Sequence, residues 1–274
     1  MPNHGIAGVG VAGLGAMGGP IARHLVRAGL DTVVFDRNRS TVDEHVEGGA
    51  RAAGSAAELG GCDVVLVIVP SDEDVLEVSA AVLATAKRGS ALLICSSVTP
   101  ETSRRVEAEA GGAGVAVLDA ALTGGVRGAE NGEIVLLVGG EESVLDRVRP
   151  ALAPWTKAVH HLGPLGSGQV GKTVNNLCHW GQITAIVEAM RLGRSLGVEP
   201  AKLRRALLDG VAASATLAQL ELMRFTWYRK DLANAFRMAD GVGQDLPVAH
   251  TAREVMEGIT VAGVAELFEG PASY

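Results

Sequence analysis

The stretch "IAGVGVAGLGAMG" (residues 6–18) contains two overlapping GxGxxG patterns, over Gly8–Gly13 and Gly13–Gly18. This pattern indicates a dinucleotide site only where a strand precedes it and a helix follows it. The first frame would need a strand in residues 1–7, which contain a proline, and a helix that begins on a glycine-rich run. The second frame follows the apolar segment Ile6–Ala12 and precedes Ile21–Gly29, a helical pattern that ends at a glycine. We therefore place the turn at Gly13, Leu14, Gly15, Ala16, Met17 and Gly18.

Each glycine of this turn has a physical task in a nucleotide site. Gly13 permits the tight turn, Gly15 lets the backbone approach a pyrophosphate, and Gly18 lets the helix pack on the strand. The N–H groups at the start of the helix would face the phosphates.

Asp36 ends the next apolar segment, eighteen positions after Gly18. An acid there accepts hydrogen bonds from an adenosine ribose and repels a 2′-phosphate, which favours NAD over NADP. Arg37 and Arg39 stand beside it and could face a 2′-phosphate instead, so NADP stays open.

Short apolar segments alternate with helical patterns over the first 160 residues, as expected for an α/β fold with a doubly wound parallel sheet. The predicted strands are Ile6–Ala12, Thr32–Phe35, Val64–Val69, Ala91–Ile94, Val115–Leu118 and Ile134–Val138. From Gln169 to Gly270 only helical patterns occur, and the first of them runs without proline to about Leu196. The sequence therefore predicts a doubly wound, dinucleotide-binding domain over residues 1–164 and an all-helical domain over residues 165–274.

Composition limits the classes of partner. The 274 residues carry a net charge of −7 with no basic cluster, which argues against nucleic acid and anionic membranes and favours a small molecule. The longest uninterrupted apolar run, Val64–Val69, is too short to span a bilayer, so we expect a cytoplasmic protein. Three cysteines and seven histidines lack metal-ligand spacing, so we expect reduced thiols and no metal site.

The segment "GKTVNNLCHW" (residues 171–180) places four polar side chains in a predicted helix. At 100° per residue they fall within one arc about 100° wide, and they are Lys172, Asn175, Asn176 and His179. One interpretation is that these residues form the solvated side of an amphipathic helix. Its core side would then consist of Val170, Val174, Leu177, Gly181 and Ala185. The same stripe continues into Ile183, Ile186 and Met190, which instead indicates a covered face. A lysine there without an acid in its stripe is a candidate for proton transfer.

A second glycine-rich segment, "DAALTGGVRGAENG" (residues 119–132), follows the predicted strand Val115–Leu118. Ligands of open α/β sheets collect at the carboxyl ends of strands. The Thr123 hydroxyl and the N–H groups of Gly124 and Gly125 would suit a carboxylate. The alternative is an ordinary turn.

Four motifs in this order resemble the β-hydroxyacid dehydrogenases, the family of 3-hydroxyisobutyrate dehydrogenase and tartronate semialdehyde reductase. The glycine turn at 13–18 is the first, and Asp119–Gly125 is similar to the family's D-A-P-V-S-G-G segment. Gly166–Asn176 is similar to its G-x-G-x-x-x-K-x-x-N-N signature, and Lys230-Asp231-Leu232 to a late K-D-L. The resemblance covers nearly the whole chain.

The resemblance implies an NAD(P)-dependent enzyme that moves hydride between nicotinamide and a small 3-hydroxy acid or its semialdehyde. It also implies a Rossmann domain joined by a long helix to an all-helical domain, in a homodimer or homotetramer, with the active site in the cleft between the domains. Lys172 would be the general acid/base, Asn176 would orient the substrate, and residues 123–125 would hold its carboxylate. The residues implied to line the cofactor, beyond the glycine turn, Asp36 and Arg37, are Val69, Pro70, Ser97 and Lys230, and Lys230 would also lie near the substrate.

Several positions depart from the family pattern. Thr123 stands in place of serine, Ala121 in place of proline, and Ile94 and Ser97 where the family often has Asp and Thr. His179 occupies a position where a small apolar residue is expected, and we assign it to substrate binding. Its replacement should then alter the ranking of substrates, whereas a structural His179 would affect only stability. These differences bear on the substrate more than on the class of reaction.

Three alternatives remain open. A 6-phosphogluconate dehydrogenase relative would prefer K-x-x-H-N, where this chain has Asn175. An imine reductase relative would commonly lack the lysine found at 172. A non-catalytic nucleotide-binding module would have no need of a proton donor on a covered helix face.

Overall fold

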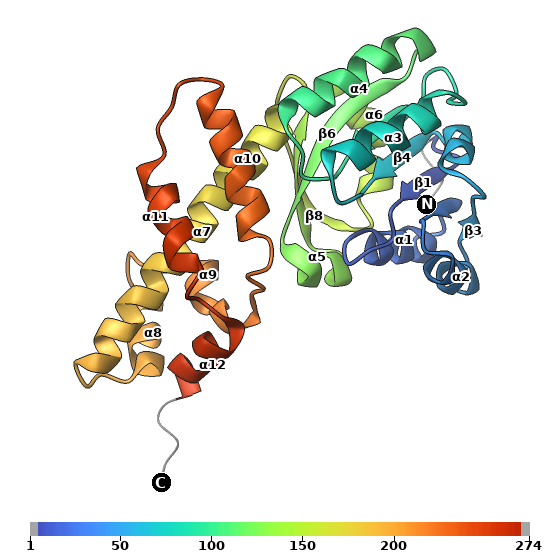
Figure 1. The fold of residues 1–274 in the computed structure, drawn as a ribbon. Coiled ribbons are helices and arrows are strands. Elements are labelled where there is room, and N and C mark those ends of the chain that lie inside the picture. Colours follow the sequence, from blue (N-terminus) through green and yellow to red (C-terminus); the bar gives the residue numbers. More distant parts are fainter. Residues whose placement is uncertain (1–4, 270–274) are drawn as a thin grey trace. The chain divides into compact units, whose positions relative to one another are not determined.

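The chain folds into two compact units that divide after Lys172, and the computed structural model describes residues 5–269 (Figure 1). The predicted domain boundary lay near residue 164, ahead of this division. Helix α7 (Ser167–Ser195) begins in the first unit and continues into the second.

The first unit contains an eight-stranded sheet in the order β3-β2-β1-β4-β5-β6-β7-β8. Its strands are β1 (Val9–Ala12), β2 (Thr32–Phe35), β3 (Arg51–Ala52), β4 (Val64–Val67), β5 (Ala91–Ile94), β6 (Ala116–Thr123), β7 (Ile134–Gly139) and β8 (Thr156–Gly163). The order of the first six strands is that of a dinucleotide-binding Rossmann domain, as predicted.

The sheet is mixed, which differs from the predicted parallel sheet. β7 runs antiparallel to β6, with Asp119 opposite Gly139 and Thr123 opposite Val135, and every other neighbouring pair is parallel. Only residues 124–133 connect β6 to β7. A parallel crossover needs about a dozen residues or more, so this short connection returns the chain in the opposite direction.

All six predicted strands are present, with ends that differ by up to five residues. β3 and β8 were not predicted. β3 has only two residues, and both are exposed. β8 alternates exposed and half-buried residues and contains Lys157, His160 and His161, so it lacks the apolar run by which the inner strands were found.

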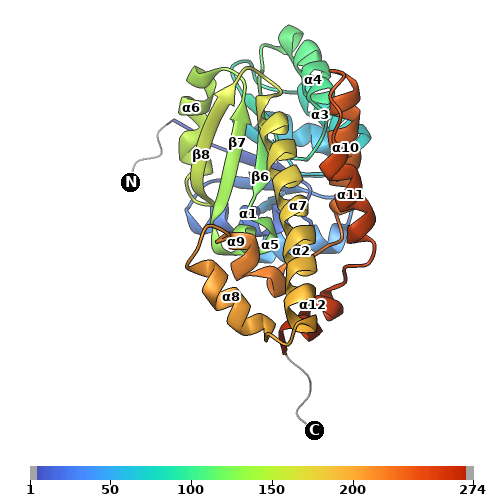
Figure 2. The same ribbon diagram turned by 90° about the vertical axis from the view of Figure 1, so that its left-hand side faces the viewer.

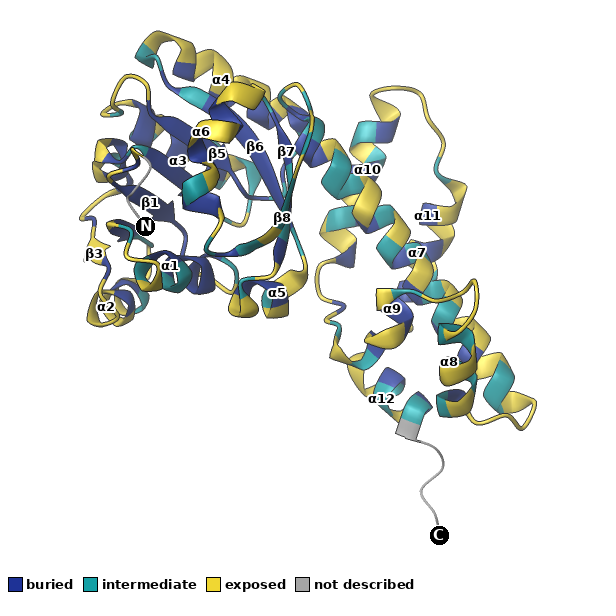
Figure 3. Ribbon diagram, turned by 180° about the vertical axis from the view of Figure 1, so that it is seen from behind, coloured by how far each residue is buried: buried dark blue, intermediate teal, exposed yellow. Residues whose placement is uncertain are grey.

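Helices cover both faces of this sheet, whose central strands β1, β4 and β5 are buried at every position (Figure 3). Within β4, Val64 and Leu66 pack toward one face while Val65 and Val67 pack toward the other. The first face is covered by α1 (Gly18–Arg27), α2 (Arg39–Glu47), α5 (Gly125–Asn131) and α6 (Glu142–Leu152). The second is covered by η1 (Ala56–Gly61), α3 (Asp72–Leu83) and α4 (Pro100–Ala113).

The second unit is helical, as predicted, and is built on the remainder of α7, the longest helix in Figure 2. Its other helices are α8 (Pro200–Leu208), α9 (Ala215–Ala218), η2 (Leu220–Leu222), α10 (Tyr228–Asp240), α11 (Pro247–Met256) and α12 (Val261–Glu269). Trp180, Ile183 and Val187 of α7 enter its core. Among residues 5–269, no helix combines the length and apolar character needed to cross a bilayer.

Candidate active site

The glycine-rich turn lies where the strand order of the sheet reverses, between β1 and β4. Gly13 follows β1 with φ +95°, and its N–H donates to the Phe35 carbonyl at 2.8 Å. A Cβ on Gly13 would come within 2.1 Å of the Ile68 carbonyl oxygen after β4. Only glycine fits there, and such switch points are where open α/β sheets bind ligands.

The other two glycines of the turn differ in their surroundings. A Cβ on Gly18 would lie 1.9 Å from the Gly13 carbonyl oxygen, so Gly18 lets α1 pack tightly against the turn. Gly15 is exposed, and among the described residues no atom outside its two chain neighbours lies within 4 Å of the position of its Cβ. Helix α1 starts without a side-chain cap at Met17 and without an acid in its first turn. This open, uncapped helix start fits a pyrophosphate.

Asp36 holds this turn through its carboxylate. Its Oδ2 accepts the Leu14 N–H at 2.7 Å, and its Oδ1 accepts the Asn38 N–H at 2.8 Å. A carboxylate has about four acceptor positions, so Asp36 can still accept from ribose hydroxyls. The neighbouring Arg37 pairs through Nη1 with Asp74 Oδ1 at 2.8 Å and through Nη2 with Glu77 Oε2 at 2.9 Å.

The segments that follow β4 and β5 contain the predicted cofactor-lining residues, and hydrogen bonds join these two segments. The Val69 N–H donates to Ser96 Oγ at 2.8 Å, which ties the residue before the exposed Pro70 to the end of β5. Gln169 Nε2 donates to the Ser96 carbonyl at 2.9 Å, and Gln169 Oε1 accepts the Val98 N–H at 3.1 Å. The half-buried Ser97 is therefore fixed by its two neighbours.

At the end of β6 lie the groups predicted to donate hydrogen bonds to a substrate carboxylate. One of them already bonds within the protein. Thr123 Oγ1 donates to the Val135 carbonyl at 2.9 Å, so its hydrogen is engaged within the sheet. Gly124 and Gly125 are exposed and have φ values of +108° and +62°. Their backbone N–H groups are therefore the donors that this segment can offer to an anion.

Asp119 lies earlier in β6 and is fully buried. Its carboxylate accepts the Gly166 N–H at 2.6 Å and the Gln169 N–H at 2.7 Å, at the start of α7. Burial raises the pKa of the Asp119 carboxyl, and these N–H donors oppose that effect by lowering it. Asp119 and Gln169 received no predicted role, although an acid that ends an apolar strand is a recognisable signal of buried polar contacts.

The four residues of the polar stripe on α7 differ in their exposure. Lys172 and His179 are half-buried, Asn175 is exposed and Asn176 is 7% exposed. The stripe then continues into the buried Ile183 and Met190, which confirms the covered face there. The amphipathic alternative is wrong for Val170 and Val174, which are 44% and 54% exposed, whereas Leu177 packs against the core of the second unit.

In the second unit, the predicted substrate residues are joined to its helical frame. Asn175 Nδ2 donates to Asn176 Oδ1 at 3.1 Å. His179 Nδ1 lies 3.3 Å from Thr216 Oγ1 of α9, so this ring has a structural contact. Trp180 Nε1 donates to Asp231 Oδ2 at 3.1 Å, which fixes the first turn of α10 next to the exposed Lys230.

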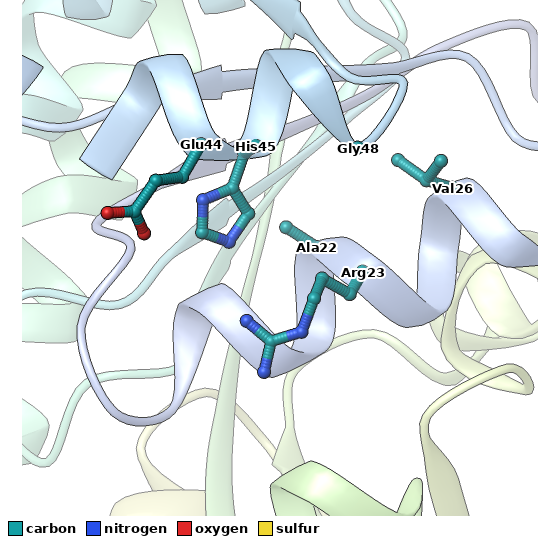
Figure 4. Close-up of a pocket in the computed structure, with 6 residues that line it drawn as sticks. All are labelled: Ala22, Arg23, Val26, Glu44, His45 and Gly48. Carbon is teal, nitrogen blue, oxygen red and sulfur yellow. The ribbon is translucent and has the colours of Figure 1, made fainter. Parts of the chain in front are cut away.

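The structure thus brings the first-unit residues to one edge of the sheet, beyond the carboxyl ends of β1, β2, β4, β5 and β6, where α7 also starts. A separate pocket of about 240 Å³ lies between α1 and α2 (Figure 4). It is lined by Ala22, Arg23, Val26, Glu44, His45 and Gly48, none of which was a predicted site residue. Within residues 5–269, no group of three His, Cys, Asp or Glu side chains is placed to hold a metal ion.

A Rossmann unit with a turn shaped for pyrophosphate, followed by a helical unit, is the architecture of a nicotinamide-dependent oxidoreductase. Residues 8–163 match the family described as the NAD binding domain of 6-phosphogluconate dehydrogenase. Residues 166–267 match the family described as NAD-binding of NADP-dependent 3-hydroxyisobutyrate dehydrogenase.

Curated relatives and solved structures agree with these matches. A 3-hydroxyisobutyrate dehydrogenase of Pseudomonas aeruginosa is 32% identical over 94% of this chain and 97% of its own length. An NAD-dependent L-serine dehydrogenase of the same organism is 38% identical over 68% of this chain and 64% of its own length. The structure of Mycobacterium tuberculosis 3-hydroxyisobutyrate dehydrogenase with L-serine superposes with a TM-score of 0.85, at 28% identity, covering 92% of this chain and 93% of that one. The chain belongs to the β-hydroxyacid dehydrogenase family and is an NAD(P)-dependent oxidoreductase.

Proposed function

We propose that this enzyme interconverts a small 3-hydroxy acid and its semialdehyde, with Lys172 as the general acid/base. The observation that carries the proposal is the placement of Lys172 and Asn176 on one face of α7, the first half-buried and the second 7% exposed. Residues four apart on a helix are neighbours, so a proton carrier and an amide stand side by side. A non-catalytic module would not need this pair.

The substrate carboxylate would be held by the N–H groups of Gly124 and Gly125, with the Thr123 hydroxyl oxygen beside them. The Asn176 amide would donate to the reacting oxygen and orient it. When bound, the nicotinamide supplies or accepts the hydride. Lys172 Nζ would give a proton to the carbonyl oxygen in reduction and take it from the hydroxyl in oxidation, which requires a lysine that can exchange protons at the working pH. Lys230 would complete the site as a positive charge near the substrate and cofactor.

The substrate class is supported by what the relatives are named for. L-serine and 3-hydroxyisobutyrate both carry a hydroxyl on the carbon β to a carboxylate. This is the arrangement that one carboxylate nest and one proton carrier at a fixed separation would recognise. His179 is the remaining position at which we propose a substrate contact, and its bond to Thr216 would fix the ring while it discriminates among side chains.

We propose NAD as the preferred cofactor, with NADP as the weaker one. Asp36 places a negative charge at the end of β2, where a 2′-phosphate would be repelled. The guanidinium of Arg37 forms ion pairs with Asp74 and Glu77, both on α3. These ion pairs, and not a 2′-phosphate, account for its position.

We also propose that the enzyme works as a homodimer or homotetramer. Leu162, Val170 and Val174 are 46%, 44% and 54% exposed, and a second copy would cover such apolar side chains. Light scattering should give a mass above that of one chain, and Val174→Glu should lower it.

A spectrophotometric assay that follows nicotinamide absorbance tests the proposal, with NAD and NADP each offered L-serine, 3-hydroxyisobutyrate, 6-phosphogluconate and a cyclic imine. Turnover of a 3-hydroxy acid with NAD supports it. Turnover of only 6-phosphogluconate or only the imine would favour the corresponding alternative. Asn175 in place of histidine and the presence of Lys172 speak against those two outcomes.

A further inference from the structure

Asp119, which the proposed reaction does not use, caps a helix from a neighbouring strand. Its Oδ1 and Oδ2 accept the N–H groups of Gly166 and Gln169, which lie on either side of Ser167, the first residue of α7. The first N–H groups of any helix have no partner within that helix. Here the partner comes from β6, the strand that continues to the predicted carboxylate nest at residues 123–125.

The surroundings of this carboxylate are built to admit it. A Cβ on Gly139 would lie 2.4 Å from Asp119 Oδ1, and a Cβ on Gly168 would lie 2.9 Å from Oδ2. Glycines therefore make the space on both sides. Hydrogen bonds from N–H groups to a carboxylate are shorter and stronger than neutral ones. The start of α7 is consequently fixed to β6 by two strong hydrogen bonds to the fully buried Asp119 carboxylate.

Gln169 extends the same junction to the other predicted cofactor residues. Its side chain is buried at 1% exposure, and its amide bonds the backbone on both sides of Ser97, at Ser96 and Val98. Ser96 Oγ in turn accepts the Val69 N–H. One continuous network therefore joins the segments after β4 and β5, and Asp119 within β6, to the first turn of α7.

We infer that Asp119 and Gln169 are positioning residues that set Lys172 against the cofactor wall and the carboxylate nest. Lys172 follows Gln169 by three residues on the same helix, a rise of about 4.5 Å. Every contact of the network lies within the first compact unit, which also contains Lys172. Neither residue touches the reacting atoms. The inference rests on the proposed role of Lys172.

Gln169→Met tests the inference because it keeps the volume and removes both amide bonds. We expect kcat to fall about 10- to 100-fold, since a displacement of about 1 Å can cost 100-fold. The dissociation constant of NADH, measured by fluorescence without substrate, should rise by a smaller factor than kcat falls, because Ser97 is one of several predicted cofactor-lining residues. In the cofactor-free protein, hydrogen–deuterium exchange should become faster at the Val98 amide.

Ser90→Ala is the matched control. Ser90 is buried at the opposite end of β5 and donates to the Lys87 carbonyl at 2.7 Å, so its loss removes a hydrogen bond of a buried side chain. This variant should melt at a lower temperature with kcat unchanged. A kcat for Gln169→Met within twofold of the parent would overturn the inference. An equal loss of NADH binding and kcat would overturn it too, because it would show general loosening.

Gln169→Glu is a second test of the inference, for use if the methionine variant does not fold. A protonated glutamate can accept from Val98 and donate to the Ser96 carbonyl, whereas an ionised one can only accept. Its kcat relative to the parent should therefore rise as the pH falls, and a flat ratio would count against positioning. Lys172→Ala is measured in parallel. If that variant keeps full turnover, the proposed function fails, while the amide exchange still reports whether the junction holds α7.

Discussion

Gly15→Ala should separate cofactor binding from folding more cleanly than any other change in the glycine turn. A Cβ at Gly15 meets no atom within 4 Å outside its chain neighbours in the described structure, and its φ is not in the left-handed region. The folded protein should therefore be unchanged or stabilised by about 0.4–1 kcal/mol, because alanine restricts the unfolded chain. The methyl group would occupy the space that the pyrophosphate needs. Losing one charge-assisted hydrogen bond reduces the free energy of binding by about 1.5–3 kcal/mol. The dissociation constant of NADH should therefore rise about 10- to 150-fold.

Gly18→Ala is the comparison variant, because its Cβ would lie 1.9 Å from the Gly13 carbonyl oxygen. Relieving that overlap requires the helix or the turn to move, at a cost of about 1–3 kcal/mol or more in folding. Urea unfolding and calorimetric titration with NADH should therefore show a stable, weakly binding Gly15→Ala and an unstable Gly18→Ala. If Gly15→Ala bound NADH as tightly as the parent, the pyrophosphate could not lie over Gly15, and the assignment of the turn would be refuted.

Three further changes have defined outcomes. Lys172→Ala should lower kcat by about 100- to 10,000-fold, with NADH binding changed only a few fold in the same titration; undiminished turnover of a 3-hydroxy acid would remove Lys172 from the mechanism. Asp36→Ala should raise the KM for NAD about tenfold or more and narrow the preference over NADP, since it removes both the charge and the bond to the Leu14 N–H; an unchanged ratio of kcat/KM for the two cofactors would exclude Asp36 as the selector. Burial raises the pKa of the Cys62 thiol to about 11 and that of Cys95 to about 12. Thiolate forms only as the pH rises toward these values, so at pH 8 a thiol reagent should modify the exposed Cys178 first and the other two only on unfolding; rapid reaction of all three in the native protein would contradict this burial.

The inner sheet could be predicted because its strands are covered on both faces, which requires uninterrupted Val, Ile and Leu segments such as Val64–Val67. The antiparallel direction of β7 could not be predicted, because it depends on the length of the connection from β6 and not on the composition of the strand. β8 was not predicted because one of its sides is exposed to solvent, as His160 and Leu162 are. It therefore lacks an uninterrupted apolar segment.

Within the site, single residues could be predicted more easily than their partners. The spacing of Lys172 and Asn176 indicated a shared helix face, since that relation is local. The contacts of Asp119 with Gly166 and Gln169 span 47 and 50 positions, and those of Gln169 with Ser96 and Val98 span 73 and 71. Spacing within one segment contains no information about contacts of that range. The engagement of the Thr123 hydroxyl by Val135 was hidden for the same reason, because it depends on the antiparallel pairing of β6 and β7.

The two outer strands of the sheet differ sharply from the inner ones, and this affects how the protein behaves at high concentration. An open strand edge offers unpaired N–H and C=O groups on which another chain can add a strand and begin aggregation. β3 presents only two residues, and its Arg51 is held by Asp31 through Nη2 and Oδ2 at 2.7 Å. β8 carries an exposed Lys157 and pairs with β7 through two register irregularities. Both edges thus discourage strand addition, so the long, flat pairing that would let one sheet extend into the next molecule is blocked at each side.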